Sequence, residues 1–200
     1  MTGNGFFAMM ARMKYIDRWA LMRNTSKESL ASHSLETAML AHALCVISNR
    51  RHGTAYDAER AAILALFHDC GEIITGDLPT PVKYFNPEIK NAYRKVEESA
   101  REDLLRMLPE DLREDYEGLL SPDEEDAALR PVIKAADKLS ALIQCIEEGR
   151  MGNTEFTDAE ESVRLSLADT GIPAVEDFMR EFIPAYSLTL DQLKRSVGDE

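Results

Sequence analysis

The stretch Ala61-Ala62-Ile63-Leu64-Ala65-Leu66-Phe67 runs directly into His68-Asp69-Cys70-Gly71-Glu72. Seven consecutive apolar residues predict a buried element, and an imidazole and a carboxylate at its end need a partner there. If the segment continues as a helix, His68 and Glu72 are four residues apart and share one side of it. Gly71 and Gly76 then mark where the helix weakens and stops. A metal ion is the simplest partner, and a solvated helix end with His68 on the helix dipole is the structural alternative.

Length, charge and cysteine content narrow the class of protein. The 200 residues include 44% hydrophobic residues and no Gly/Ser- or Pro-rich linker, so we expect one domain over residues 1–200. The formal net charge of −13 argues against a nucleic-acid polymer or an anionic membrane as partner, and it leaves room for a small anion at a local cationic site. Cys45, Cys70 and Cys145 fit neither a disulfide framework nor a zinc knuckle. With no apolar run of signal-peptide or transmembrane length, we expect a cytoplasmic protein.

Apolar residues recur at helical spacing along the whole chain, and no stretch shows sustained strand alternation. This pattern predicts an all-α fold. Helices are expected over about 6–16, after the polar segment 24–29, between Pro87 and Pro109, over 154–169, over 173–183 and around 190–193. Ser121-Pro122-Asp123-Glu124 has the form of a capping box, which predicts a helix start there, with Pro131 as a kink or restart before Gly149.

Histidines are candidate metal ligands. His33 is expected in the first turn of the second helix. His42 follows nine residues later, which places it on the opposite face of that helix, so it is expected to be structural or exposed. His52 is expected in a loop. His33 therefore remains the candidate to join His68.

Three further places carry candidate functional side chains. Arg18 precedes Trp19, the single Trp of the chain, and its guanidinium suits bidentate phosphate contact, although a core Trp beside a surface Arg is the structural alternative. In residues 75–81, one Gly and two Pro fix the path of a loop, so Asp77 could line a pocket or simply favour the turn. Asp137 lies inside a predicted helix, where Asp is unfavourable, and small neighbours would let another element approach it.

In combination, these residues follow the order H…HD…D with His33, His68-Asp69 and Asp137, which resembles the HD-domain phosphohydrolases. The resemblance covers almost the whole chain. Arg18-Trp19, Glu72 and the string TGDLPTPVKYFN at residues 75–86 are similar to the bacterial HD-domain 5′-deoxynucleotidases, which remove phosphate from deoxyribonucleoside 5′-monophosphates. The string is the most specific part of the resemblance.

The resemblance implies a compact multi-helix HD-domain fold and one divalent cation, with the metal ligands His33, His68, Asp69 and Asp137. Two imidazoles and two carboxylates without a thiolate suit Mn²⁺, Co²⁺, Fe²⁺, Ni²⁺ or Zn²⁺.

The resemblance also implies roles around that site. Glu72 would orient or deprotonate the attacking water, or protonate the leaving 5′-oxygen. Arg18 would hold the phosphate during catalysis, Trp19 would pack against the sugar, and Asp77 would accept from the 3′-hydroxyl. Nucleotide contacts are further implied for Asp77, Leu78, Pro79 and Thr80, and the assembly is implied to be a homodimer.

Two residues depart from the family pattern. Ser32 stands where relatives usually have an acidic residue, so support of His33 is expected to differ. Gly71 is expected to loosen the helix that holds Glu72. Two other functions remain open from the sequence: a phosphohydrolase of the same superfamily acting on a cyclic or polyphosphorylated nucleotide, and a non-catalytic nucleotide-sensing or scaffold protein. Intact Glu72 and Arg18 count against the second.

Overall fold

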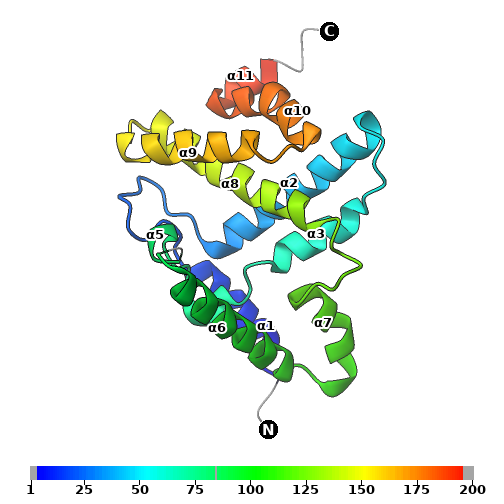
Figure 1. The fold of residues 1–200 in the computed structure, drawn as a ribbon. Coiled ribbons are helices and arrows are strands. Elements are labelled where there is room, and N and C mark those ends of the chain that lie inside the picture. Colours follow the sequence, from blue (N-terminus) through cyan, green and yellow to red (C-terminus); the bar gives the residue numbers. More distant parts are fainter. Residues whose placement is uncertain (1–3, 84, 196–200) are drawn as a thin grey trace.

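The structure, a computed structural model, describes residues 4–83 and 85–195 apart from the side chain of Thr80. Every regular element in these ranges is helical, so the all-α prediction is confirmed (Figure 1). The α-helices are α1 (Phe6–Met10), α2 (Leu30–Arg51), α3 (Ala58–Phe67), α4 (Glu72–Thr75), α5 (Thr80–Lys83), α6 (Pro87–Arg106), α7 (Arg113–Leu120), α8 (Arg130–Arg150), α9 (Thr157–Ala168), α10 (Pro173–Glu181) and α11 (Leu190–Arg195). Short 3₁₀ turns are η1 (Ala11–Tyr15), η2 (Glu110–Leu112), η3 (Thr154–Phe156) and η4 (Ile183–Ser187).

The larger hydrophobic core lies where α2 packs against α3 and α8. Helices α2 and α8 lie at the centre of the molecule (Figure 1). Its large members include Leu44, Leu64, Leu139, Ile143 and Phe178. Alanines on these helices, including Ala41, Ala65 and Ala136, are fully buried. Because such small side chains allow backbones to approach closely, α2, α3 and α8 form one tightly packed unit.

A second, smaller cluster joins α1, α6 and α7 through Phe6, Leu104, Leu108 and Leu120. Cys70 belongs to this cluster, whereas Ala65, five residues earlier, belongs to the larger core. The intervening turn, which contains His68 and Asp69, is therefore held between two cores.

Helix α2 begins with a reciprocal cap in which Ser29 and Ser32 each accept a backbone N–H of the other. Among the described residues, α2 is also long and apolar enough to cross a membrane, with a mean hydropathy of 1.3. The expectation that no stretch reaches transmembrane length is therefore wrong, judged by the length and composition of α2. However, 56% of that stretch is buried inside the protein, as it is in the core helix of a soluble protein.

The expected helix start at Ser121 is wrong. Residues 121–129 form turns, and α8 begins at Arg130 with Pro131 in its first turn. Two contacts explain this: the Asp123 side chain accepts from the backbone of Glu125 at 2.8 Å, and the buried Asp126 carboxylate accepts from Arg60 of α3 at 2.7 and 3.0 Å. Local Asp–backbone bonding competes with helix formation. Helix α7 was not expected, and the first expected helix changes to 3₁₀ geometry at Ala11.

The continuous helix through His68 to Glu72 is also not observed. Helix α3 ends at Phe67, residues 68–71 form a turn, and α4 begins at Glu72. Gly71 is where α6 comes close, because a Cβ placed on it would lie 3.3 Å from the carbonyl oxygen of Glu97. Gly76 ends α4 with φ of +74°, a conformation that favours glycine.

Candidate active site

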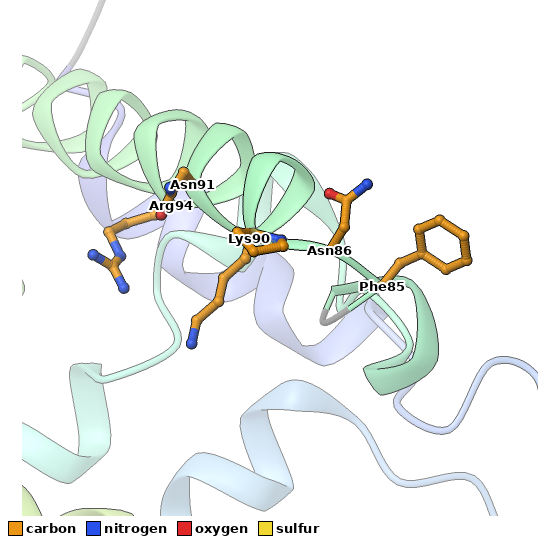
Figure 2. A pocket seen from close by; sticks show the side chains of 6 residues that line it. Phe85, Asn86, Lys90, Asn91 and Arg94 are labelled. Atoms are coloured by element: carbon orange, nitrogen blue, oxygen red, sulfur yellow. The ribbon is translucent and has the colours of Figure 1, made fainter.

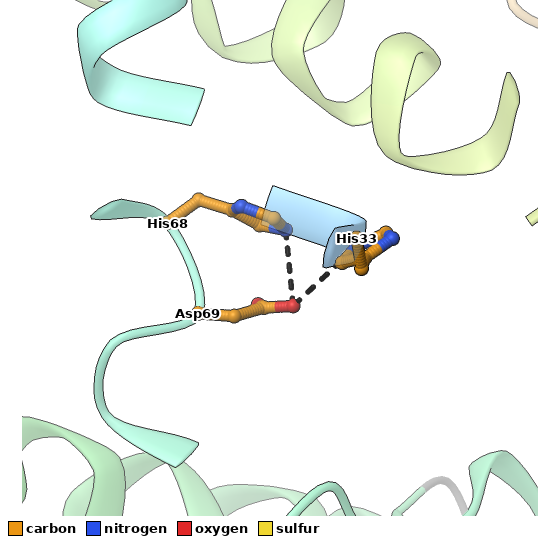
Figure 3. Close-up of side chains that lie close together, drawn as sticks. All are labelled: His33, His68 and Asp69. Carbon is orange, nitrogen blue, oxygen red and sulfur yellow. Dashed lines mark ion pairs between the residues drawn. The ribbon is translucent and has the colours of Figure 1, made fainter. Parts of the chain in front are cut away.

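Three donor side chains converge at the turn after α3 (Figure 3). His68 Nδ1–H donates to the carbonyl of Ala65 at 2.7 Å, which leaves Nε2 facing Asp69 Oδ2 at 3.0 Å. From α2, His33 Nε2 lies 3.7 Å from the same oxygen. One donor atom from each of the three residues lies within 4.8 Å of the others, which is the spacing of a possible metal site.

Asp137 of α8 adjoins this trio, since its Oδ1 lies 3.2 Å from His33 Nε2. Its side chain is 38% exposed, whereas His33 is fully buried. The neighbouring Ala135 and Ala136 are buried, which is how α8 comes close enough to α2 to present a carboxylate from its interior. The four predicted ligands are thus brought together from three separate parts of the chain, and their role as ligands stays a prediction.

The protonation states of His68 and Asp69 depend on one another. Burial would lower the pKa of His68, but Asp69 and then Asp137 raise it to about 9. Burial would raise the pKa of Asp69, but the His68 imidazolium lowers it. His68 Nε2 is buried, and among the described residues its contact with Asp69 Oδ2 at 3.0 Å is an ion-pair contact without hydrogen-bond geometry. A site in which carboxylates draw positive charge onto an imidazole fits a divalent cation, which would take over that role with neutral imidazoles.

Arg18 interacts electrostatically with these carboxylates. Its side chain is 13% exposed, and its Nε lies 3.7 Å from Glu28 and 3.9 Å from Asp77. Burial works against its charge, but Glu28, Asp137 and other carboxylates raise its pKa. Within the described residues, Nε and Nη1 are buried without a hydrogen-bond partner. The guanidinium is therefore a charged donor available to an anion.

Glu72 is buried, and its Oε2 has no hydrogen-bond partner among the described residues. Its Oε1 accepts from Lys83 Nζ at 3.3 Å, and the same ammonium donates to Glu97 at 3.0 Å. Burial, followed by the carboxylates of Asp69 and Asp77, raises the pKa of Glu72 to about 8. This carboxyl group can therefore take up or release a proton near neutral pH.

A cavity of about 430 Å³ opens beside these groups. It is lined by Arg18, Trp19, Ala20, Leu21, Met22, Asp77, Leu78, Pro79, Pro81, Asp137, Lys138, Ala141, Ala159, Ser162 and Val163. The predicted substrate residues Arg18, Trp19, Asp77, Leu78 and Pro79 are all in its wall. The side chain of Thr80 lies outside the described part of the chain, as does Tyr84 of the TGDLPTPVKYFN string. The hollow of about 460 Å³ at the start of α6, whose lining includes Phe85, Lys90 and Arg94, contains no predicted site residue (Figure 2).

The remaining histidines lie elsewhere. His42 is exposed, and His52 follows the end of α2, where its Nε2 lies 2.9 Å from Asp177. Both placements match the expectations for these residues.

The structure adds supporting residues that the sequence pattern did not reveal. His33 Nδ1–H donates to Ser140 Oγ at 3.0 Å, and the Ser140 hydroxyl donates to Glu36 at 2.6 Å. Ser32 is occupied by the helix cap, so support of His33 comes from α8. Helical spacing places these supporting residues beside the ligands, because Glu36 follows His33 by three residues and Ser140 follows Asp137 by three, so each pair shares one face of its helix.

Comparison with known proteins identifies a family and close relatives by sequence. The family model described as 5′-deoxynucleotidase YfbR-like matches residues 5–186. A 5′-deoxynucleotidase of Shewanella oneidensis is 48% identical over 189 residues, which cover 94% of this chain and 97% of the relative. A 5′-deoxynucleotidase of Vibrio vulnificus is 43% identical over 193 residues, which cover 96% of this chain and 100% of the relative.

Solved structures share the fold. An HD-domain phosphohydrolase from Listeria innocua superimposes with a TM-score of 0.78 at 22% identity, covering 96% of both chains. A cyanophage S-2L HD phosphohydrolase bound to dA and one catalytic Zn²⁺ ion has a TM-score of 0.61 at 19% identity, covering 91% of this chain and 96% of that one. With the HD-domain fold established and the family model matching nearly the whole sequence, the chain belongs to the YfbR-like 5′-deoxynucleotidase family.

Proposed function

We propose that this protein hydrolyses deoxyribonucleoside 5′-monophosphates to a deoxyribonucleoside and phosphate, using one divalent cation. One observation carries the proposal: a cluster of two imidazoles and two carboxylates adjoins a cavity whose wall also holds a buried guanidinium with unpaired donors. The 43% and 48% identical relatives bear the same activity in their names and match almost their full lengths.

In this proposal the cation is held by His33, His68, Asp69 and Asp137. When bound, such an ion neutralises charge on the phosphoryl oxygens and lowers the pKa of water. The convergence of His68 Nε2 with His33 and Asp69 and the absence of a thiolate from the donor set support a borderline ion such as Mn²⁺, Co²⁺, Fe²⁺, Ni²⁺ or Zn²⁺. The Zn²⁺ ion in the cyanophage neighbour supports this class of metal.

Arg18 is proposed to hold the phosphate. Its charge is maintained by surrounding carboxylates, and its Nε and Nη1 donate no hydrogen bond among the described residues. A local cation of this kind is needed in a chain with a net charge of −13, because the overall field repels anions. The guanidinium would hold the phosphoryl group in one orientation relative to the attacking water.

Glu72 is proposed to move the proton. Its free Oε2 can accept from an attacking water, and its raised pKa also allows it to return a proton to the leaving 5′-oxygen. Lys83 holds the other oxygen, so the carboxyl group keeps one orientation.

The nucleoside is proposed to occupy the cavity beyond the phosphate. Trp19 would pack against the C2′ side of the sugar, Asp77 would accept from the 3′-hydroxyl, and Leu78 and Pro79 would contact the rest of the nucleoside. Thr80 is retained as a nucleotide contact on the resemblance alone. A ribose hydroxyl would be excluded by the bulk of the indole.

We further propose a cytoplasmic homodimer as the working form. The chain's acidity supports a small-molecule substrate in place of a nucleic-acid polymer or membrane surface. The three cysteines are free thiols, which supports a location in which thiols stay reduced. Size-exclusion chromatography with light scattering tests the dimer.

The activity is tested by phosphate release from a panel of deoxyribo- and ribonucleoside 5′-, 3′- and cyclic phosphates, each with several divalent metals. The expected result is turnover of deoxyribonucleoside 5′-monophosphates above all others. A preference for cyclic or polyphosphorylated nucleotides would favour another activity of the superfamily. Nucleotide binding without turnover under any metal would favour a sensing or scaffold protein.

A further inference from the structure

Glu28 lies where three of the proposed site residues meet, although no role has been assigned to it. Trp19 Nε1–H donates to Glu28 Oε2 at 2.8 Å, and Arg18 Nε lies 3.7 Å from the same oxygen. The other oxygen, Oε1, lies 3.5 Å from His33 Nδ1. A single carboxylate thus contacts the proposed phosphate, sugar and metal residues.

The backbone fixes Glu28 opposite Arg18. The segment from residue 16 to residue 30 is closed by paired backbone bonds, in which Leu30 N–H donates to Ile16 and Arg18 N–H donates to Glu28, both at 2.9 Å. Asp17 and Ser29 form an isolated antiparallel bridge beside them. The Glu28 side chain is 7% exposed. It therefore lies inside the closed loop and has little freedom to move.

Trp19 needs such an anchor. Its φ is +59°, and among the described residues other than glycine it alone has a positive φ. This backbone conformation is unfavourable for a bulky residue, so the surroundings have to maintain it. The indole is held at its nitrogen by Glu28 and on its ring by Phe156, whose centroid lies 5.2 Å away. With both contacts in place, Trp19 stands in the cavity wall.

We propose that Glu28 is a positioning residue that sets sugar selectivity by fixing the Trp19 indole and the Arg18 guanidinium relative to one another. Glu28 acts through these two residues and does not line the cavity itself. Arg18 and Trp19, held by Glu28, would then form one rigid unit whose spacing matches the distance from the phosphate to C2′ of the substrate. A 2′-hydroxyl would collide with the indole. This inference rests on the proposed function.

Glu28→Gln is the direct test, because an amide cannot satisfy the same neighbours. One oxygen of Glu28 faces the indole N–H and Arg18, and the other faces His33 Nδ1, so either orientation of the amide points its NH₂ group at a donor. The ratio of kcat/KM on dAMP to that on AMP is expected to fall at least about tenfold, with metal content retained. Because Trp19 is the single Trp, its emission anisotropy is expected to fall as well.

Trp19→Phe tests the same contact from the other side. It keeps an aromatic ring and removes the N–H donor, so the dAMP/AMP ratio should fall here too. Adding Glu28→Gln to Trp19→Phe should lower the ratio by less than Glu28→Gln does in the wild type, since the part of the effect that passes through the indole N–H is already lost. If Glu28→Gln fails to fold by circular dichroism, Glu28→Asp takes its place, because the shorter side chain keeps the charge but withdraws the carboxylate from the indole N–H, and the dAMP/AMP ratio should fall in the same way.

Asp126→Asn is the matched control, because Asp126 is another buried carboxylate held by an arginine and it does not line the cavity. It should lower the melting temperature and leave the dAMP/AMP ratio unchanged. The inference is overturned if Glu28→Gln keeps the wild-type ratio and anisotropy, if Trp19→Phe keeps the wild-type ratio, or if the Glu28→Gln effect persists undiminished in the double variant. Failure of the wild type to release phosphate from dAMP would instead reject the proposed function.

Discussion

The carboxyl group of Glu72 is balanced between opposing influences. Burial, followed by Asp69 and Asp77, raises its pKa to about 8, and Lys83 works in the opposite direction. A group with this balance can exchange protons near neutral pH, whereas an exposed glutamate stays ionised. Glu72 therefore differs from the proposed ligand Asp69 beside it, because its pKa is raised whereas that of Asp69 is lowered.

Glu72→Ala is expected to retain the metal and to lose about 10²-fold or more in kcat, because a proton-transfer group is removed and no proposed ligand is. Metal content by elemental analysis and kcat on dAMP, measured on one preparation, check this. Loss of metal together with activity would make Glu72 a ligand or a fold element.

Trp19→Ala is expected to raise activity on AMP relative to dAMP, even if both values fall. Removing a bulky pocket group should shift the selectivity by about 1–3 kcal/mol. The check is kcat/KM on both nucleotides with the folded, metal-loaded variant. An unchanged ratio would return Trp19 to a packing role against Phe156.

Residue types and order marked His33, His68, Asp69 and Asp137 as candidates, and the family resemblance joined them into one site, where they do converge. Their support could not be predicted in the same way. The Ser140–Glu36 pair behind His33 joins residues 104 positions apart, and Glu28 reaches the site through a closed loop. Such contacts depend on how α8 crosses α2, which a local pattern does not contain.

At the scale of elements, the turn between α3 and α4 is the feature that local periodicity described incorrectly. Helical spacing predicted a continuous helix from Ala61 towards Glu72, yet the turn at residues 68–71 interrupts it. Gly71 is more than a loosening residue, because it permits the approach of α6 that completes the smaller core.

Gly71→Ala is therefore expected to destabilise the fold by about 1 kcal/mol, since its Cβ would press on the α6 backbone at Glu97. Gly149→Ala is the matched control, because it lies in α8 with no atom within 4 Å of its added Cβ, and it should stabilise by about 0.5–1 kcal/mol. Urea unfolding of both variants tests this. Equal or greater stability of Gly71→Ala would contradict the close contact with α6.

The loop that carries Arg18 and Trp19 is held on α8 by Glu148. This buried carboxylate accepts from the backbone N–H groups of Thr25 and Ser26 and from the Asn153 amide, at distances of 2.7–3.0 Å. Burial would raise the pKa of Glu148, but Asn153 and then these N–H groups lower it to about 2. The loop therefore depends on the ionised form of Glu148.

Because the folded-state pKa of Glu148 lies below its ordinary value of 4.5, its contribution to stability is complete above about pH 4.5 and is lost as the pH falls towards about 2. The difference in unfolding free energy between wild type and Glu148→Gln should be largest near pH 7 and should shrink through that window. Chemical denaturation at a series of pH values measures it. A difference that stays constant from pH 7 to pH 2 would contradict the ionised contact.

At the scale of the whole molecule, the site exists because two cores meet. The larger core orients α2 and α8, which carry His33 and Asp137, while the smaller core holds the segment that follows His68 and Asp69. The all-α class followed from periodicity, because apolar stripes at helical spacing need only local residues. The crossing of α2 and α8 is a long-range property that periodicity does not predict, and only the compact HD-domain fold that contains it was expected from the family resemblance. The single domain over residues 1–200 stays a prediction.

The central claim is that this assembled cluster binds a divalent cation on which phosphate release depends. The most direct measurement is phosphate release from dAMP by protein stripped with a chelator and then reloaded with Mn²⁺, Co²⁺ or Zn²⁺, for wild type, Asp137→Asn and the control Asp126→Asn. Stripped wild type and control should be inactive and should recover on reloading. Compared with reloaded wild type, Asp137→Asn should bind metal at least about tenfold more weakly and should turn over at least about tenfold more slowly. Full turnover by the stripped wild type, or full metal content and activity in Asp137→Asn, would contradict the account.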